Sequence, residues 1–354
     1  MKPRNKTLII FSPAFAGSEA DTVWLPWLQT LVTAFNRNYP ELSIIVFAFQ
    51  YPHTTKKYNW YGNKIIPLNG MYKKKLSRLS MWLRIFFEMQ KIKKEFTIVG
   101  IFSMWCGECT LIAKYVSKIF NVKYLCWILG QDARKNNRFV KRIQPKASSL
   151  IAMSDFLVDE FYKNHNIKPQ YVIPDGIDIG LFDSTLPKKD IDIVGAGSLS
   201  TLKQYNIFVE IISLLKKHNA NIKAVLCGDG EEENNIKNQV QNLGLENNIA
   251  LVGSVNHRNV LQTMQRAKIL LHPSSYEGFG TVCVEALYAG AHVISFVQPM
   301  KQQIKNWHIV KSIEEMYSKT FELLQNPDTN YERVLFYTMN DAARDVLKIF
   351  NYEG

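Results

Sequence analysis

The chain has 354 residues, a formal net charge of +12, 47% hydrophobic residues and 21% charged residues. This balance excludes a disordered protein, and no apolar run is long enough for a membrane-spanning helix. The length exceeds what a single hydrophobic core usually supports, which predicts two domains.

The first half of the chain alternates short apolar runs with segments of helical period. The apolar stretch 8–11 is too short for a signal peptide and is expected to be a first buried strand. Strands are expected at 7–11, 43–48, 97–102, 123–129, 149–153 and 170–173, and helices near 21–37, 72–92, 108–120 and 155–164. Apolar strands separated by helices predict a parallel sheet covered on both faces.

The same alternation starts again after residues 174–178, where proline and glycine indicate a hinge. Strands are expected at 191–195, 224–227, 249–252, 269–271 and 292–296, and helices near 203–217, 232–243, 257–267, 281–289 and 312–325. Residues 331–350 are expected to form a helical tail. Two such runs predict an α/β protein with two doubly wound domains.

The charge is divided unevenly between these halves. Residues 1–173 contain 26 Lys and Arg against 10 Asp and Glu, and the remainder contains 17 against 21. A strongly basic half next to a mildly acidic one suggests an anionic partner for the first half. A membrane surface, a pyrophosphate-bearing acceptor and nucleic acid are the candidates.

The five cysteines are scattered and odd in number, which favours a reduced, cytoplasmic compartment. Cys106 and Cys109 form a C-x-x-C pair, but no second pair and no histidine spacing accompany it, so a redox or metal site is the weaker interpretation. We favour a strand-to-helix turn in which Trp105 stacks on a sugar and Glu108 binds a hydroxyl. His272 is expected to be a packed histidine rather than a base.

A glycine loop between a buried strand and a helix stands out in the second half. The strand ends at Leu271, Gly278 and Gly280 follow, and a helix is expected to begin near Thr281. Free backbone amides and the positive end of a helix dipole at the carboxyl end of a parallel strand suit a phosphate group.

Two glutamates flank this loop. Glu285 is placed one turn inside the helix, where its carboxylate can accept hydrogen bonds from ribose hydroxyls, and Glu277 precedes the amides, where a sugar would lie. The alternative is that Glu277 only makes the loop polar and Glu285 is a first-turn charge.

Two further turns complete the pattern. Residues 194–203 supply small residues after a strand and then Lys203, a point charge suited to phosphate. A solvated lysine in a glycine turn is the alternative. Residues 227–230, Cys-Gly-Asp-Gly, are expected to form a tight turn, with Asp229 in a plain turn role.

Together these motifs resemble the retaining GT-B glycosyltransferases of family 4, also called glycosyl transferases group 1. The resemblance is carried by residues 173–178 with Phe182, by the turn from Gly197 to Lys203, and by the segment from Glu277 to Glu285. It implies two Rossmann-like domains facing a cleft, with an acceptor-binding domain at 1–173, a donor-binding domain at 174–330, and a tail at 331–354 that crosses back.

The resemblance also implies the chemistry. A sugar would move from a UDP- or GDP-sugar to a hydroxyl of a glycan or polyprenyl-linked acceptor in cell-surface polysaccharide synthesis, with retention of configuration and without metal or cofactor. Lys203 would neutralise the diphosphate, Glu285 would hold the ribose, and Glu277 would position the sugar. The donor-binding residues would be Gly197, Ser198, Lys203, Gly228, Glu277, Gly278, Phe279, Gly280, Thr281 and Glu285.

The sequence departs from the family at several positions. Ser198 stands where an arginine is usual and His292 where a proline is usual, and residues 297–309 lack a common glycine pair. A first-domain histidine that would be aimed at the sugar is replaced by the neighbourhood of Gln131 and Asp132. Asp132 is therefore the third catalytic candidate beside Glu277 and Lys203, with a strand-end cap as its alternative.

The acceptor side is less well marked. Gly17 and Glu19 follow the first strand in a loop that the resemblance places at the cleft, although Glu19 as a first-turn charge is equally compatible. The acceptor-side candidates are Gly17, Glu19, Trp105, Glu108 and Gln131.

Residues 72–94 are expected to form a helix with two different sides. One carries Lys73, Ser77, Ser80, Arg84, Glu88 and Lys91, and the other Tyr72, Leu76, Leu79, Trp82, Leu83, Phe86 and Met89. Such a helix either lies on an anionic membrane surface or packs on the sheet with its basic side in water.

Three rival functions remain. A basic nucleic-acid-binding protein lacks a recognisable binding motif, and we expect no nucleic-acid partner. A nicotinamide-dependent enzyme would need a third glycine where Ser200 stands. A weakly catalytic relative of the glycosyltransferases is compatible with Ser198.

Overall fold

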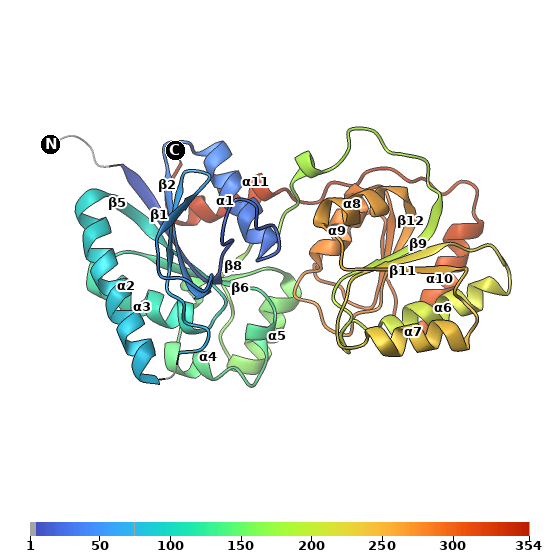
Figure 1. Ribbon diagram of the computed structural model, residues 1–354, viewed down its shortest axis with the longest axis horizontal. Coiled ribbons are helices and arrows are strands. Elements are labelled where there is room, and N and C mark those ends of the chain that lie inside the picture. The colour runs from blue at the N-terminus through green and yellow to red at the C-terminus, as the bar shows by residue number, and fades with distance from the viewer. Residues whose placement is uncertain (1–4, 74, 354) are drawn as a thin grey trace. The chain divides into compact units, whose positions relative to one another are not determined.

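The computed structural model describes residues 5–73 and 75–353 of the chain. The chain divides into two compact units (Figure 1). Unit 1 comprises residues 1–175 together with 339–354, and unit 2 comprises residues 176–338. The chain passes from one unit to the other between Asp175 and Gly176.

Unit 1 is built on an eight-stranded sheet in the order β3-β4-β2-β1-β5-β6-β7-β8. Its strands are β1 (Lys6–Ala14), β2 (Ser43–Tyr51), β3 (Tyr58–Trp60), β4 (Asn63–Pro67), β5 (Thr97–Met104), β6 (Tyr124–Ile128), β7 (Leu150–Ala152) and β8 (Tyr171–Val172). The predicted sheet was wholly parallel, and this was wrong at one edge, where β3 and β4 pair antiparallel. Tyr61 and Gly62 both have positive φ and make the two-residue turn of this hairpin.

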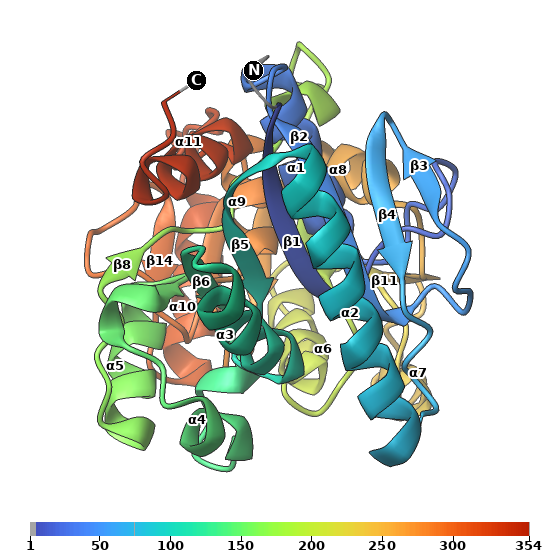
Figure 2. The same ribbon diagram turned by 90° about the vertical axis from the view of Figure 1, so that its left-hand side faces the viewer.

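Helices cover both faces of this sheet. They are α1 (Pro26–Asn38), α2 (Lys75–Glu95), α3 (Glu108–Phe120), α4 (Arg138–Ile143), α5 (Asp155–His165) and the final helix α11 (Met339–Ile349). Side chains of α2 and α3 share a core with Ile9, Phe11 and Phe47 of the sheet. Figure 2 shows α2 running along this face. Helix α11 packs against α1.

The helical tail predicted at 331–350 is shorter than expected. Residues 331–338 are not helical because their backbone bonds elsewhere in unit 2: the Val334 N–H donates to the carbonyl of Leu287, and the carbonyl of Tyr337 accepts from the N–H of Ile177. Within the predicted tail, only Met339–Ile349 is helical, and this helix belongs to unit 1.

The predicted sides of α2 were also wrong. The buried face is formed by Met81, Ile85, Met89 and Ile92, whereas Leu79, Leu83 and Phe87 are exposed. Both faces of the helix are apolar, so periodicity alone could not tell which one packs on the sheet. Glu88, predicted on the basic side, is 8% exposed and lies 2.7 Å from Nζ of Lys57.

Unit 2 has a six-stranded parallel sheet in the order β11-β10-β9-β12-β13-β14. Its strands are β9 (Ile191–Ala196), β10 (Ala224–Cys227), β11 (Ile249–Gly253), β12 (Ala267–His272), β13 (His292–Ser295) and β14 (Trp307–Ile309). Its helices are α6 (Tyr205–Lys216), α7 (Glu233–Asn242), α8 (His257–Arg266), α9 (Thr281–Tyr288) and α10 (Ile313–Gln325).

This order places the carboxyl ends of β9, β10, β11 and β12 along one edge of the unit 2 sheet. The loops that follow these strands are therefore neighbours although they lie far apart in sequence. Across residues 5–73 and 75–353, no helix is long and apolar enough to cross a membrane.

Candidate functional site

A cavity of about 520 Å³ opens at this edge of unit 2. It is lined by Ala196, Gly197, Ser198, Lys203, Cys227, Gly228, Asp229, Ser254, Val255, Val260, Glu277, Gly280, Thr281, Val282 and Glu285. Eight of the ten predicted donor-binding residues are in this set. Asp229, expected to have a plain turn role, also faces the cavity.

The floor of the cavity is formed where two glycine turns meet. Gly228 has φ of 139°, and a Cβ atom there would lie 1.9 Å from the carbonyl oxygen of Gly197. The N–H of Gly197 donates to the carbonyl of Cys227 at 3.0 Å. Only glycine allows this approach, so the floor consists of backbone that a ligand can closely approach.

Lys203 and Glu277 face each other across the cavity and form an ion pair. Lys203 lies in the turn before α6, where its N–H donates to the carbonyl of Ser200 and Gln204 adopts a left-handed conformation. Glu277 comes from the loop after β12. The pair thus joins two strand ends that are neighbours in the sheet.

His272, the last residue of β12, lies behind this pair. It is 1% exposed, and its Nε2 atom is 3.1 Å from Oε2 of Glu277. Burial lowers the pKa of His272, and nearby Lys203 lowers it further although Glu277 opposes this. A neutral imidazole then donates its Nε2–H to the carboxylate, so the expected packed histidine also orients a site residue.

The electrostatics keep Glu277 ionised. Burial raises the pKa of its carboxyl, but the hydrogen bond from His272 and the positive charge of Lys203 outweigh this and lower the pKa to about 2. Glu277 therefore enters the site as a charged acceptor whose side chain is 20% exposed, and its remaining lone pairs are available to hydroxyl groups.

Helix α9 begins directly at the cavity. Gly280 has φ of 85° at its N-cap, and Gly280, Thr281 and Val282 all line the cavity. The first N–H groups of a helix have no acceptor within it and carry partial positive charge. This end of α9 is suited to an anion such as a phosphate.

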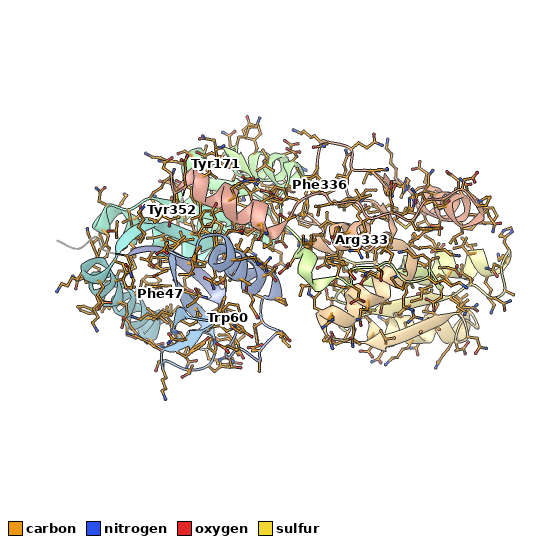
Figure 3. All side chains as sticks on the ribbon, turned by 90° about the horizontal axis from the view of Figure 1, so that it is seen from above. Phe47, Trp60, Tyr171, Arg333, Phe336 and Tyr352 are labelled. Carbon is orange, nitrogen blue, oxygen red and sulfur yellow. The ribbon has the colours of Figure 1, made fainter. Side chains whose placement is uncertain are left out.

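Two predicted donor-binding residues do not line the cavity. Phe279 is 1% exposed and packs toward Phe336, a residue of the segment before α11 (Figure 3), with ring centroids 6.1 Å apart. Its large apolar ring belongs to the core of unit 2, where it fixes the loop that carries Glu277. Gly278 is likewise outside the lining residues described for this cavity.

Glu285 has a partner that sequence reasoning missed. Nε2 of His257 lies 2.7 Å from Oε1 of Glu285. His257 is the first residue of α8, after the N-cap Asn256, whose side chain accepts from Asn259. Ser254, Val255 and Val260 from the same region line the cavity. These residues follow β11, which ends at the same edge of the sheet as β9, β10 and β12. Their position in the sequence could therefore have indicated that they lie at the cavity.

The unusual residues around β13 form a separate arrangement. Nδ1 of His292 is 3.0 Å from Nε2 of His308 on the neighbouring strand, and Nε2 of His292 is 3.1 Å from the carbonyl of Asn330. Residues 298–300 and 302–304 contribute to a second cavity of about 400 Å³ beside β14. These residues replace the glycine pair expected from the family.

Asp132, in unit 1, is buried at a strand end. Its Oδ1 accepts from the N–H groups of Leu129 and Gly130, at 3.1 and 2.9 Å, and its Oδ2 accepts from that of Cys106 at 2.8 Å. Burial raises the pKa of this carboxyl although the three backbone donors oppose the rise. The geometry favours the alternative role of a loop cap over direct catalysis. Gln131 is exposed beside it.

Glu108 and Trp105 also have partners within unit 1. Oε1 of Glu108 accepts from Nε1 of Trp82 at 3.1 Å, and Oε2 lies 3.4 Å from Arg78. This carboxylate is thus held against α2 rather than presented to a hydroxyl. Trp105 has φ of 58° and meets the ring of Trp27 edge-on at 5.7 Å. Cys106 and Cys109 are buried free thiols. A hydrogen bond with Cys126, together with burial, raises the pKa of Cys106, and burial raises the pKa of Cys109.

The loop after β1 holds Gly17 and Glu19. The N–H of Gly17 donates to Oδ2 of Asp21 at 2.8 Å, and Oε1 of Glu19 accepts from the N–H of Tyr61 at 2.8 Å. Helix α1 begins only at Pro26, so Glu19 is not a first-turn charge. Instead it holds the β3–β4 turn.

The sequence is similar to known glycosyltransferases. Residues 179–329 match the family model described as glycosyl transferases group 1. The gpi3 subunit of a phosphatidylinositol N-acetylglucosaminyltransferase from Schizosaccharomyces pombe is 32% identical over 133 residues, which cover 37% of this chain and 29% of that protein. A Campylobacter jejuni GalNAc-alpha-(1->4)-GalNAc-alpha-(1->3)-diNAcBac-PP-undecaprenol alpha-1,4-N-acetyl-D-galactosaminyltransferase is 30% identical over 171 residues, 46% of each chain.

The fold has solved counterparts that extend over nearly the whole chain. The Anabaena protein Alr3699/HepE in complex with UDP-glucose superposes with a TM-score of 0.64 at 16% identity, over 97% of this chain and 94% of that one. The chain spans less than half the length of the two relatives named above. The chain thus has the GT-B fold, and its residues 179–329 match the glycosyl transferases group 1.

Proposed function

We propose that this chain is a glycosyltransferase that binds a nucleotide-sugar in the cavity of unit 2. The observation that carries the proposal is the placement of Lys203, Glu277, Glu285 and the first turn of α9 around one cavity. A cation and helix amides suit a diphosphate. Glu285 suits ribose hydroxyls, and Glu277 suits hydroxyls of the transferred sugar.

The donor is a UDP- or GDP-sugar in this proposal, and the group transferred is a hexosyl residue. The complex of the Anabaena protein with UDP-glucose supports a uridine donor by analogy. The name of the Campylobacter relative supports a lipid-linked glycan as acceptor, held by unit 1. We further propose retention of configuration, as in the family that the motifs resemble.

Catalysis would then rest on stabilising the leaving group. As the bond between the anomeric carbon and the diphosphate breaks, its electron pair leaves with the nucleoside diphosphate. Lys203 and the amides of α9 are fixed in place to stabilise that charge without the help of a metal ion. The acceptor hydroxyl bonds to the anomeric carbon on the face that the diphosphate leaves, and its proton passes to an oxygen of the departing diphosphate.

Calorimetry with UDP-, GDP- and ADP-sugars tests the donor site. We expect one nucleotide class to bind and Glu285→Ala to weaken that binding at least about tenfold, since two charge-assisted hydrogen bonds are lost. Glu246→Ala is the matched control, because Glu246 is exposed in unit 2 and does not line the cavity. Equal affinities of Glu285→Ala and the wild type would overturn the assignment.

A transfer assay tests the activity itself. Lys203 is the single Lys or Arg among the described residues that line the cavity, because Ser198 stands where the resembled family has an arginine. This favours one second candidate, a donor-binding relative with weak catalysis. Donor binding without transfer or donor hydrolysis, over a panel of lipid-linked and free glycans, would select that candidate.

A further inference from the structure

Helix α2 has an apolar face that does not pack on the protein. Leu79, Leu83 and Phe87 are each more than half exposed, at 53%, 52% and 56%. Their spacing of four residues puts them on one stripe, opposite the stripe of Met81, Ile85 and Met89 that packs on the sheet. The second stripe therefore leaves a row of large apolar side chains in solvent.

Helix α3 extends this apolar surface. Tyr115 and Ile119 are 55% and 61% exposed. They lie seven and eleven residues after Glu108, so they share the side of α3 on which Glu108 meets Trp82 of α2. The exposed side chains of the two helices thus border each other. We call these five residues, Leu79, Leu83, Phe87, Tyr115 and Ile119, the apolar patch.

A basic cluster lies next to the apolar patch. Residues 134–146, which include α4, contain six Lys and Arg and no Asp or Glu. Nζ of Lys114 on α3 donates to the carbonyl of Ile143, the last residue of α4, so α4 adjoins α3. Figure 2 views unit 1 from the side on which α2, α3 and α4 lie.

Five of the six cations in this cluster are exposed. Among residues that the structure describes, no ion pair involves Lys135, Arg138, Lys141, Arg142 or Lys146. The carboxylates of Glu88 and Glu108 are paired inside unit 1 with Lys57 and Arg78. Exposed Glu95 sits beside Lys93 and Lys94 at the end of α2. The surface is thus apolar and strongly positive at once.

We propose that this face of unit 1 binds the surface of an anionic lipid bilayer. The apolar patch would enter the boundary between headgroups and acyl chains, and the basic cluster would lie on the phosphate layer. A second copy of the chain is a poorer occupant, because two such faces would bring like charges together. The proposal goes beyond nucleotide-sugar transfer and concerns a surface outside the cavity of unit 2.

Vesicle co-sedimentation tests the proposal. The full chain should bind vesicles of phosphatidylcholine with roughly 30% phosphatidylglycerol, bind pure phosphatidylcholine at least about tenfold more weakly, and be released from the anionic vesicles by high salt. The double variant Leu83→Gln/Phe87→Gln should bind anionic vesicles at least about tenfold more weakly. Since both side chains are more than half exposed, the variant should keep its melting temperature.

Two control sets match these changes. Leu243→Gln/Val252→Gln removes exposed apolar side chains of unit 2, and Lys188→Gln/Lys217→Gln/Lys348→Gln removes three exposed charges elsewhere. Both should bind like the wild type, whereas Arg138→Gln/Lys141→Gln/Arg142→Gln should lose binding and most of its salt dependence. Equal binding by all variants, or none by the wild type, overturns the proposal. The variant Leu83→Gln/Phe87→Gln could instead bind vesicles like the wild type but have a lower apparent mass on size exclusion. That result would overturn the membrane proposal and show that the apolar patch is an interface between copies of the chain.

Discussion

Lys203 and Glu277, 74 residues apart in the sequence, form an ion pair inside the cavity of unit 2, and His272 holds the same carboxylate from the buried side. The residue proposed for the diphosphate and the residue proposed for the sugar therefore hold each other in place. A bound diphosphate would share Lys203 with Glu277, so the cation needs no rearrangement to meet it.

The first prediction concerns the stability of this pair. Lys203→Met should lower the free energy of unfolding by about 1 to 3 kcal/mol, because it leaves a carboxylate that is only 20% exposed without its cation. Lys203→Met/Glu277→Gln should recover at least about 1 kcal/mol of this loss, since the unpaired charge is gone. Urea denaturation of both single variants and the double variant measures the coupling. Strict additivity of the two single changes would contradict the ion pair.

The second prediction is a pH dependence that comes from Glu277. The pKa of its carboxyl is lowered from 4.5 to about 2 in the folded chain. The stabilisation is therefore complete above pH 4.5 and is lost as the pH falls toward 2. Glu277→Gln should be less stable than the wild type by up to about 3 kcal/mol at neutral pH. Denaturation from pH 6 to 2.5 should show this difference shrinking below pH 4.5, and a constant difference would count against the shifted pKa.

Much of unit 2 was predictable because its local patterns agree with its tertiary structure. The strand, the glycine loop and the helix from Thr281 follow one another in the expected order, although the strand begins at Ala267 rather than at residue 269. Gly197, Lys203 and Glu285 meet at one cavity. His257 was missed because its contact with Glu285 depends on which strand ends are neighbours in the sheet, and no local period carries that information.

Unit 1 was less predictable for a different reason. Its helix α2 is apolar on two sides, so the sequence period is equally compatible with Met81 or Leu83 packing on the sheet. Charged residues were predicted to face solvent or a ligand. Instead, Glu108 accepts a hydrogen bond from Trp82, and Asp132 accepts hydrogen bonds from backbone N–H groups. Whether a polar side chain is already satisfied depends on tertiary neighbours.

The third prediction concerns the glycine floor of the cavity. Gly228→Ala should destabilise the chain by about 3 kcal/mol or more and abolish nucleotide binding, because the added Cβ would lie 1.9 Å from the Gly197 carbonyl oxygen. Gly244→Ala is the matched control. Gly244 also has positive φ, at 61°, but nothing lies within 4 Å of its Cβ position, so about 1 kcal/mol is expected. Thermal denaturation and calorimetry measure both. Similar losses in the two variants would mean that the close contact does not matter.

The fourth prediction is a gain of function at Ser198. This residue lines the cavity and stands where the resembled family has an arginine. Ser198→Arg should tighten binding of the preferred nucleoside diphosphate about fivefold or more, since a second cation then reaches the phosphates. Asn242→Arg, which adds the same charge at an exposed position in unit 2, should change little. Unchanged affinity in Ser198→Arg would argue that the phosphates lie elsewhere.

The fifth prediction separates the ribose contact from the rest of the donor. If Glu285 binds the ribose, the 2′-deoxy form of the preferred nucleotide should bind the wild type more weakly than the ribonucleotide, by about 1 to 2 kcal/mol. Glu285→Ala should abolish that difference, because no acceptor then remains for the hydroxyl. His257→Ala should reduce it, since Nε2 of His257 lies 2.7 Å from Oε1 of Glu285 and orients the carboxylate. His257→Gln should restore part of it, and His218→Ala, at an exposed histidine of unit 2, should leave it intact. A full ribose preference in Glu285→Ala would move the ribose to another part of the cavity, and His257 would then have only a structural role.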